Sequence, residues 1–565
     1  MNLNIKAKQE TTYDAIVVGS GISGGWAAKE LSEKGLKTLV LERGRNVEHP
    51  QDYPTAMLKP WELPLRNRLT AEEREVSHVQ SRTYAFSEST KHFFVNDKEN
   101  PYTETKRFDW IRGYHVGGRS LMWGRQSYRL SDLDFEANAK DGIAVDWPVR
   151  YKDLEPWYDY VESFAGISGQ AEGLAHLPDG KFLPPMEMTC LEKHVAKKIR
   201  ENWSDRIMTI GRVANLTQPH NGRGKCMYRN LCSRGCPYGA YFSSNAATLP
   251  AAAQTGNMTL RPYSIVNSLI FDEKQGKVVG VRVIDSETNE WLEYYAKIIF
   301  LNASTLGSTF ILLNSVSESF PNGFGNSSDQ VGRNLMDHHF MTGARGEYEG
   351  FEDETYTGRR ANGIYIPRYR NIKEKHPDFI RGFGIQGSGM RDSWTRGANI
   401  EGIGEDLKKS LTEPGPWTMG LTCFGECLPY EDNRVTLNTA VRDKWGQPTL
   451  SIDCSFRENE MNMRKDMANS AAEMLEAAGL KKVYTYDNGA YPGLGIHEMG
   501  TARMGRDPKT SVLNGYNQCH DSLNVFITDG AAMTSSACQN PSLTYMALTA
   551  RACDHAVKEL KRGNL

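Results

Sequence analysis

Three of the chain's ten cysteines lie within eleven residues, at Cys226, Cys232 and Cys236. Their segment, NGRGKCMYRNLCSRGCPYGA at 221–240, is also rich in Gly, Arg and Lys. Thiolates bind soft metal centres, and basic neighbours and backbone N–H groups stabilise their charge. Three local thiolates favour a cuboidal iron–sulfur cluster that lacks one iron. A 4Fe–4S cluster with a remote ligand, a zinc site, and free or disulfide-bonded cysteines are the alternatives.

A second group of residues has the spacing of a dinucleotide site. Residues 13–43 read as strand, glycine turn, helix, strand and acid. Gly19 would allow the sharp turn, and Gly21 would let the backbone approach a pyrophosphate. Gly24 would let the helix pack closely on the strand. The helix N-terminus would face the phosphates, and Glu42 a ribose hydroxyl. The stretch fits NAD and FAD equally, and its alternative is a glycine-rich turn in an unrelated α/β protein. Its predicted elements are strand 15–18, helix 25–34 and strand 37–41.

A second glycine-rich loop, IRGYHVGGRSLMWGR at 111–125, supports a nucleotide ligand. Its glycines remove side chains where the backbone must approach something large and flat, although a plain turn cluster has the same composition. Elsewhere, His338 and His339 are adjacent in sequence. Adjacent side chains point apart on any regular element, so we do not expect these two to bind a metal together.

Composition excludes several classes of function. The 565 residues carry a net charge of −2, with acidic and basic residues mixed throughout, so no nucleic-acid or anionic-membrane partner is indicated. No apolar run reaches the ~18 residues of a membrane span. The first residues, MNLNIKAKQETTYD, contain no apolar signal core and no twin arginine. We therefore expect a cytoplasmic protein, or a periplasmic one if a partner that carries the signal exports it.

The chain order predicts an α/β protein, α+β overall, with two kinds of sheet. A Rossmann-like nucleotide-binding domain is followed by an inserted antiparallel-sheet substrate domain, whose aromatic residues suit a sugar or another ring. The nucleotide-binding domain then resumes. The nucleotide-binding domain is predicted mainly over 1–345, the sheet domain over 346–485, and the return to the nucleotide-binding domain over 486–565. The first range contains an irregular excursion at 44–105, a peripheral segment at 146–205 and the cysteine loop at 221–240.

Motifs along the whole chain resemble the glucose–methanol–choline family of flavin oxidoreductases. They are GSGISGG with Glu42, GGRSLMWG, VGRNLMDH, DNRVTLN, HEMGTARMG and NVFITDGAAMTSSACQNPSLT. The resemblance implies FAD rather than NAD. It also implies a Rossmann-like FAD-binding domain assembled from distant segments, with a sheet-based substrate domain over it.

The same resemblance implies the site residues. His497, which begins the HxxGT motif, matches the family's base, and Asn540 matches its partner, where some members have a second histidine. Met122 stands where some sugar oxidases carry a histidine bonded to FAD, so we expect non-covalent FAD. The other implied flavin contacts are Gly117, Gly118, Ser120, Trp123, Asp529, Gly530 and Asn540 itself.

The C-x5-C-x3-C-P loop is similar to that of bacterial glucose, gluconate, fructose and glucoside 3-dehydrogenase large subunits. In those proteins a 3Fe–4S cluster takes electrons from FAD. The stretch GRRANGIYIPRYRN favours the glucoside 3-dehydrogenase type, which makes 3-keto sugars. The implied partners are a sugar or glycoside, an external acceptor such as a cytochrome c, and a small accessory subunit. The alternatives are a sugar oxidase, a gluconate-, glucose- or fructose-type dehydrogenase, a flavin lyase or isomerase, and a non-enzymatic iron–sulfur subunit.

Overall fold

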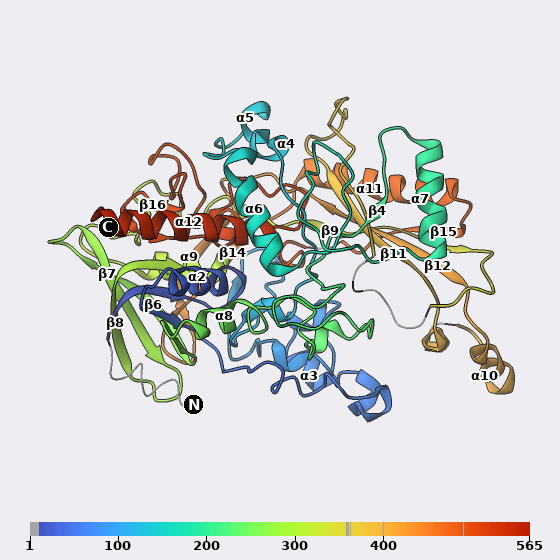
Figure 1. Ribbon diagram of the computed structural model, residues 1–565, viewed down its shortest axis with the longest axis horizontal. Helices are drawn as coiled ribbons and strands as arrows, with labels where there is room; N and C mark the ends of the chain where they lie inside the picture. Colours follow the sequence, from blue (N-terminus) through green and yellow to red (C-terminus); the bar gives the residue numbers. More distant parts are fainter. Residues whose placement is uncertain (1–10, 357–360, 362, 399, 490) are drawn as a thin grey trace.

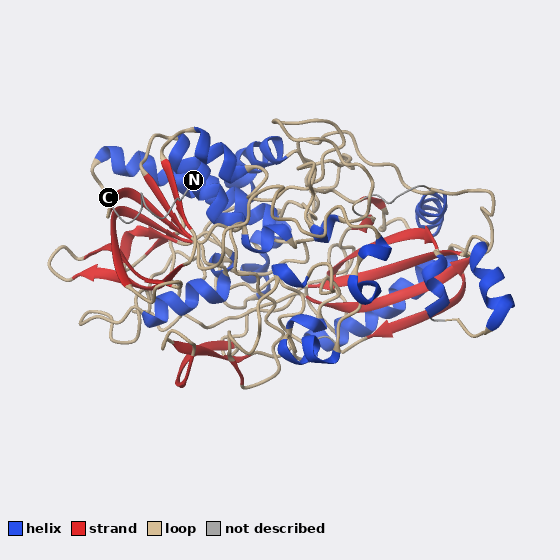
Figure 2. Cartoon of the chain, turned by 90° about the horizontal axis from the view of Figure 1, so that it is seen from below, coloured by secondary structure: helices blue, strands red, loops and turns tan. Residues whose placement is uncertain are grey.

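The computed structural model describes residues 11–356, 361, 363–398, 400–489 and 491–565. Two sheets lie at opposite ends of the molecule, with mostly loops between them (Figure 1, Figure 2). The C-terminus lies at the end that holds the parallel sheet. Within the described residues, no helix is both long and apolar enough to cross a membrane.

The first sheet has eight strands and contains the predicted nucleotide-binding core. Its main path runs in the order β16-β17-β8-β1-β2-β5, and the antiparallel pair β6 and β7 continues from β8. β1 pairs in parallel with β2 on one side and β8 on the other. Ile16 and Val18 pack into one apolar core and Ala15 and Val17 into another, so both faces of β1 are covered and it reads as a continuous apolar run. The strands are β1 (Thr12–Val18), β2 (Thr38–Leu41), β5 (Met258–Arg261), β6 (Ser264–Asp272), β7 (Lys277–Asp285), β8 (Trp291–Leu301), β16 (Gln518–Cys519) and β17 (Ser522–Phe526).

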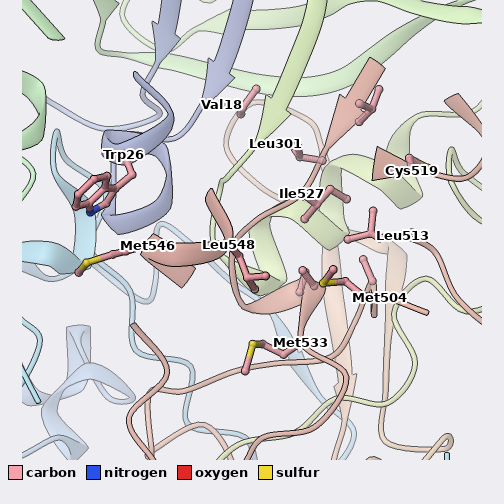
Figure 3. Packing of buried hydrophobic residues seen from close by; sticks show 14 of the residues in the cluster. Val18, Trp26, Leu301, Met504, Leu513, Cys519, Ile527, Met533, Met546 and Leu548 are labelled. Atoms are coloured by element: carbon pink, nitrogen blue, oxygen red, sulfur yellow. The ribbon is translucent and has the colours of Figure 1, made fainter. Parts of the chain in front are cut away.

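Helices pack on this sheet and on one another. α2 begins at Ile22, three residues earlier than predicted, because Gly24 and Gly25 both lie inside its first turns. α12 contacts α2 and α6, and the resulting core extends from Val18 to Leu548 (Figure 3). The helices of this end are α2 (Ile22–Glu33), α6 (Tyr151–Ala165), α8 (Thr248–Gln254), α9 (Thr305–Asn314) and α12 (Ser542–Arg562).

The second sheet has six strands, in the order β15-β9-β12-β11-β10-β4, and it is antiparallel throughout. α11 (Glu458–Ala477) and α7 (Cys190–Asn202) pack against it. The predicted range of 346–485 differs from this sheet at its start, because β9 begins at His339 and β4 and α7 come from earlier in the chain. The strands are β4 (Thr209–Ile210), β9 (His339–Tyr348), β10 (Ile364–Ile366), β11 (Phe383–Arg391), β12 (Trp417–Gly425) and β15 (Lys481–Asp487).

The predicted excursion at 44–105 returns to the body through a third, small sheet. Its last residues form β3, which pairs in parallel with β14, and β14 pairs with β13. The elements not yet placed are β3 (Thr103–Glu104), β13 (Arg434–Arg442), β14 (Pro448–Asp453), α3 (Ala71–Val76), α4 (Asp132–Phe135), α5 (Ala137–Asp141) and α10 (Gly404–Thr412).

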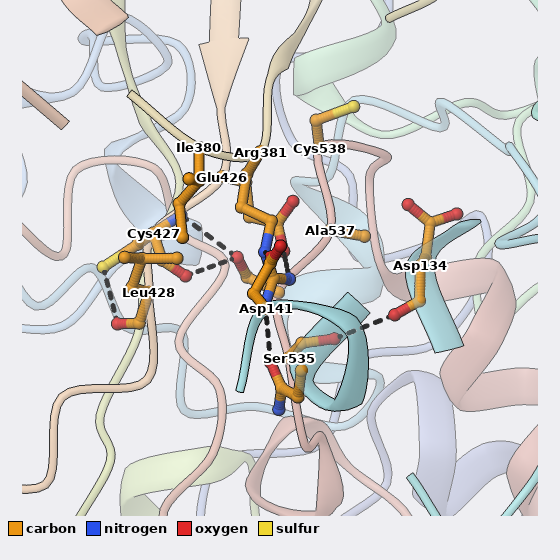
Figure 4. Close-up of polar contacts among 12 residues, drawn as sticks. Asp134, Asp141, Ile380, Arg381, Glu426, Cys427, Leu428, Ser535, Ala537 and Cys538 are labelled. Atoms are coloured by element: carbon orange, nitrogen blue, oxygen red, sulfur yellow. Dashed lines mark hydrogen bonds and ion pairs between the residues drawn. The ribbon is translucent and has the colours of Figure 1, made fainter. Parts of the chain in front are cut away.

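A buried arginine ties the antiparallel sheet to the rest of the molecule (Figure 4). Arg381 donates to Asp141 at 2.6 Å, to Asn138 at 2.8 Å and to Glu426 at 2.8 Å. Glu426 follows β12, whereas Asn138 and Asp141 belong to α5. Three charge-assisted or neutral hydrogen bonds from one planar guanidinium therefore fix the sheet's orientation toward the nucleotide-binding end.

Candidate active site

One cavity of about 520 Å³ runs between the two sheets. The glycine turn after β1 lines one part of it, and His497 and Asn540 line another. The N-terminal fingerprint and the C-terminal motifs, almost five hundred residues apart in sequence, thus line the same cavity.

The three glycines of the fingerprint have different surroundings. Gly19 has φ +93°, and a Cβ on it would lie 2.3 Å from the carbonyl oxygen of Asn302. A Cβ on Gly24 would lie 2.0 Å from the carbonyl oxygen of Gly19. Around Gly21, by contrast, no atom lies within 4 Å of the Cβ position, and Gly21 faces the cavity. No side chain caps the first turn of α2, so its N–H groups remain available to an anion.

Glu42 lies at the end of β2 and joins the loops around it. One carboxylate oxygen accepts from Ser20 Oγ at 2.6 Å and from the Ser20 backbone N–H at 3.1 Å. The other accepts from the Gly44 N–H at 3.0 Å. Burial raises the pKa of Glu42. The side chain lines the cavity beside the glycine turn, where a ribose hydroxyl would meet it.

The second glycine loop lies directly on the first. The Gly117 N–H donates to Ser20 Oγ at 2.9 Å, and a Cβ on Gly118 would stand 3.6 Å from the Gly21 Cα. Ser120 Oγ accepts from the Ser244 N–H at 3.0 Å, which holds the loop in place, and Ser120 also lines the cavity. Trp123 anchors the loop's far end through a 2.9 Å bond to a backbone carbonyl. Met122, Trp123 and Gly118 line the cavity, as predicted flavin contacts would.

Asp529 and Gly530 follow β17 at the carboxyl edge of the parallel sheet, where ligands of such sheets bind. Asp529 accepts from Ser308 Oγ at 2.6 Å and from the Ala531 N–H at 3.0 Å. Burial raises the pKa of Asp529 to about 6. A Cβ on Gly530 would lie 2.3 Å from the carbonyl oxygen of Glu498, so this turn packs against the segment that carries His497.

His497 and Asn540 meet in the cavity. Asn540 Nδ2 lies 3.4 Å from His497 Nε2. Asn540 stands just before α12, and His497 stands in a loop that Asp337 holds by accepting three backbone N–H bonds. Their lengths are 2.7, 2.9 and 2.9 Å, from Gly493, Gly495 and His497. Burial, together with the nearby Glu498, raises the pKa of Asp337 to about 7.

An ion pair between the partly buried Arg119 and the buried Glu498 supports the same loop from the other side. Arg119, in the second glycine loop, donates to both carboxylate oxygens of Glu498 at 2.9 and 2.7 Å. Glu498 follows His497 directly. The pair therefore connects the predicted flavin-lining loop to the residue beside the predicted base, in a bidentate geometry that fixes both.

His338 is a site residue that the sequence analysis missed. Its Nδ1 lies 2.9 Å from Nδ1 of His497, and its Nε2 lies 2.8 Å from the carbonyl oxygen of Ala537. A carbonyl only accepts, so His338 carries its proton on Nε2 and accepts at Nδ1. His497 must then carry its proton on Nδ1, which leaves Nε2 unprotonated and turned toward Asn540. The sequence analysis considered His338 only as a partner of His339, and no local signal links it to a residue 159 positions away.

Burial lowers the pKa of both histidines. For His497 the pKa falls well below its usual value, and the nearby His338 and the Arg119 guanidinium add to the effect of burial. Burial likewise lowers the pKa of His338. Both rings are therefore neutral near pH 7, so the hydrogen-bond assignment above applies there and His497 Nε2 is free to accept a proton.

The three cysteines of the 221–240 loop are neighbours, but they are not assembled as a metal site. All three thiols are partly exposed, and Cys226 Sγ accepts from the Tyr228 N–H at 3.4 Å. Burial and the nearby Cys232 and Cys236 raise the pKa of Cys226. Among the residues that the structure describes, no group of three or more His, Cys, Asp or Glu side chains is placed to hold a metal ion.

The GMC oxidoreductase models, N- and C-terminal, match residues 13–340 and 429–549. The chain belongs to the GMC oxidoreductase family. It is an FAD-dependent oxidoreductase that acts on CH–OH groups. The cavity fits this cofactor: the uncapped end of α2 and the open Gly21 face it beside Glu42, and His497 lines the same space.

Relatives cover the whole chain at low identity. A 2-methyl-1,2-propanediol dehydrogenase of Mycolicibacterium austroafricanum is 28% identical over 96% of this chain and 94% of its own length. The fructose dehydrogenase large subunit of Gluconobacter japonicus is 24% identical over 99% of this chain and all of its own length. Formate oxidase of Aspergillus oryzae RIB40 shares the fold, with a TM-score of 0.62 and 13% identity over 98% of this chain and all of that chain. The predicted fold class is confirmed.

The two kinds of glycine environment predict separable effects. Gly24→Ala should lower the melting temperature of the FAD-free protein, because its Cβ would meet the Gly19 carbonyl at 2.0 Å. Gly21→Ala should leave that temperature unchanged but weaken FAD binding at least about tenfold, because its methyl group occupies the space at the end of α2. Thermal unfolding of the apoprotein and flavin titration measure both. Equal loss of stability in the two variants would contradict this reading.

The hydrogen bond between the histidines predicts a positioning role for His338. His338→Leu removes the acceptor for the His497 Nδ1 proton, so turnover should fall about 10²-fold, part of the ~10²–10⁴-fold that a positioned base contributes. The pH profile of flavin reduction should change as well, because His497 loses its fixed tautomer. His338→Gln, which offers an acceptor, should restore part of the rate. A His338→Leu enzyme with an unaltered rate and pH profile would refute the role.

Proposed function

We propose that the protein is a dehydrogenase that oxidises a secondary alcohol of a sugar or glycoside, with a 3-keto product. The observation that carries the proposal is the unprotonated Nε2 of His497, which faces Asn540 Nδ2 in the cavity that the fingerprint glycines also line. A base and a hydrogen-bond donor on one hydroxyl are what oxidation of a CH–OH group requires from the protein.

The chain's own residues account for the proton. The substrate carbon loses a hydride and its hydroxyl loses a proton, which together leave a carbonyl group. FAD, when bound, supplies the hydride acceptor. His497 Nε2 takes the hydroxyl proton, while Asn540 Nδ2 donates to the hydroxyl oxygen and orients it. His338 Nδ1 continues to accept from the His497 ring, so the imidazolium that forms keeps its partner.

The lining of the cavity suits a polyhydroxylated ring. The rings of Phe340 and Phe424 stack, with their centroids 5.1 Å apart and an interplanar angle of 18°. The centroid of the Phe424 ring lies 6.4 Å from that of the His497 ring. The amides of Gln126 and Gln386 line the same space. An apolar ring face beside a few convergent amides is typical of small-molecule sites. The relatives named for fructose, gluconate and a diol support an alcohol-bearing substrate of this kind.

Preference for a glucoside, as opposed to glucose, fructose or gluconate, is also a proposal. It rests on the stretch GRRANGIYIPRYRN, whose residues 358–360 and 362 lie outside the described part of the chain. A spectrum of flavin bleaching by each of these sugars under anaerobic conditions would rank them.

We further propose that Cys226, Cys232 and Cys236 hold a 3Fe–4S cluster through which electrons reach an external acceptor. Arg125 lines the cavity and interacts electrostatically with Cys232, so the cysteine loop borders the active site. Relatives named as a fructose dehydrogenase large subunit and a gluconate 2-dehydrogenase flavoprotein support a partner subunit and an acceptor other than oxygen.

An oxidase is the second candidate, because a 6'''-hydroxyparomomycin C oxidase of Streptomyces lividus is 26% identical over 95% of this chain. Such an enzyme would pass electrons to oxygen and would not need the cysteine loop. Hydrogen peroxide formed at the rate of substrate oxidation in air would favour the oxidase. Turnover that depends on an added dye or cytochrome would favour the dehydrogenase.

The assignment of the base predicts a large effect from one substitution. His497→Ala should lower turnover by about 10²–10⁴-fold, because no other group takes the hydroxyl proton at that position. FAD should remain bound at the wild-type level, since the fingerprint and second glycine loop are unchanged. Turnover and flavin absorbance measure the two. A variant with wild-type turnover would remove His497 from the mechanism.

The proposed cluster predicts that a cysteine substitution slows electron transfer to the acceptor more than it slows flavin reduction. Cys232→Ser should abolish the visible and spin-resonance signals of an iron–sulfur cluster and should slow electron transfer to the acceptor. Flavin reduction by substrate should be much less affected. Cys190→Ser, at a partly exposed cysteine outside the loop, is the matched control and should change neither. Equal loss of both steps in Cys232→Ser, or absence of iron from the wild-type protein, would dismiss the relay.

A further inference from the structure

A single chain of hydrogen bonds crosses the active site from one domain to the other. It begins at the Ala537 carbonyl and passes through His338 and His497 to Asn540. It then continues to Gln386, whose Nε2 lies 2.7 Å from Asn540 Oδ1. Gln386 belongs to β11 of the antiparallel sheet, where it pairs with Thr422 of β12. The outer sheet thus contributes directly to the catalytic pair.

The direction of every bond in this chain follows from its first member. The Ala537 carbonyl only accepts, which makes His497 an acceptor at Nε2. Asn540 must then present its NH₂ group to His497 and its oxygen to the other side. That oxygen in turn requires the NH₂ group of Gln386. One backbone carbonyl therefore sets the orientation of both imidazoles and both amides.

The hydrogen-bond chain ends at the amide oxygen of Gln386, Oε1. Gln386 lines the cavity, and no donor among the described residues lies within hydrogen-bond distance of its Oε1. A 180° rotation of the Gln386 amide would exchange Nε2 and Oε1 and present the NH₂ group to the cavity. That rotation is unfavourable because Asn540 Oδ1 would lose its donor. The cavity consequently presents an acceptor beside the place where Asn540 orients the reacting hydroxyl.

We propose that Gln386 is a positioning and specificity residue that selects substrates with a second hydroxyl on the carbon next to the reacting one. Its Nε2 holds the Asn540 amide toward His497, and its Oε1 accepts from the neighbouring hydroxyl. Two hydroxyls on adjacent carbons need two polar partners side by side, and the hydrogen-bonded amides of Asn540 and Gln386 lie side by side. The substrate class is therefore a vicinal diol within a larger polyol. This inference rests on the proposed oxidation of a sugar alcohol.

The two functions of Gln386 separate in kinetics. Loss of the Nε2 bond frees the Asn540 amide and should lower kcat for every substrate. Loss of the Oε1 acceptor should raise KM only for substrates that carry the neighbouring hydroxyl. A site that is built to bond a hydroxyl discriminates strongly against the analogue that lacks it, since its polar group is left unpaired.

The test compares methyl glucoside with its 2-deoxy and 4-deoxy analogues, each of which lacks one neighbour of the 3-hydroxyl. With the FAD-loaded wild-type enzyme, one of the two analogues should lose about tenfold in kcat/KM. In Gln386→Met, which keeps the length of the side chain, glucoside and that analogue should become equal and kcat should fall for both. Gln386→Glu, which keeps acceptors but not the NH₂ donor, should keep the discrimination while kcat falls.

Gln275→Met is the matched control, because Gln275 is exposed in the turn between β6 and β7 and contacts Asp272 there. It should behave as wild type. If wild-type enzyme bleaches its flavin with glucoside and both analogues equally well, or if Gln386→Met keeps the discrimination, the inference is overturned while the proposed function stands. If none of the three glucosides reduces the flavin, the proposed glucoside preference fails, and the inference with it.

Discussion

Close contact between backbones at the carboxyl edge of the parallel sheet is the constraint on which the site depends. The turn after β1 touches the segment after β8 at Gly19, the second glycine loop touches the first at Gly118, and the turn after β17 touches the His497 segment at Gly530. A side chain at Gly19 or Gly530 would push these segments apart, because its Cβ would lie 2.3 Å from a backbone carbonyl oxygen. Because side chains are absent at these glycines, segments from four regions of the chain form one continuous wall around the cavity.

Buried charge then fixes what the backbone contacts bring together. Arg119 and Glu498 join the second glycine loop to the segment that carries His497, and Asp337 holds the same segment by three backbone N–H groups. Unpaired, the buried carboxyl groups of Glu498 and Asp337 would be costly to bury. The histidines between them carry no charge, since burial lowers their pKa values. The segment that carries the base is thus held by the Arg119–Glu498 ion pair and by Asp337, while the His497 ring stays neutral and can accept a proton.

Local patterns in the sequence were sufficient for the fold class and for the glycine turn, because strand, turn and helix are adjacent there. The strand and helix at β4 and α7 were not assigned to the outer sheet, since a two-residue strand has no periodicity and its pairing with β10 crosses more than 150 residues. His497 and Asn540 were found through motifs that match a family. His338 and Gln386 were not, because each acts only through a partner that a distant segment supplies, and a single sequence carries no record of such pairs.

The direction of the hydrogen-bond chain also ties the two domains to the state of the base. Before reaction, His497 Nε2 accepts, and the whole chain from the Ala537 carbonyl to Gln386 is satisfied in one orientation. Once Nε2 has taken the substrate proton it can only donate, so the NH₂ group of Asn540 faces another donor and their bond is lost. His338 still accepts from the other side of the ring and stabilises the imidazolium. The complete chain therefore belongs to the state that is ready to bind alcohol, and the antiparallel sheet, through Gln386, supports that state in preference to the one that follows proton transfer.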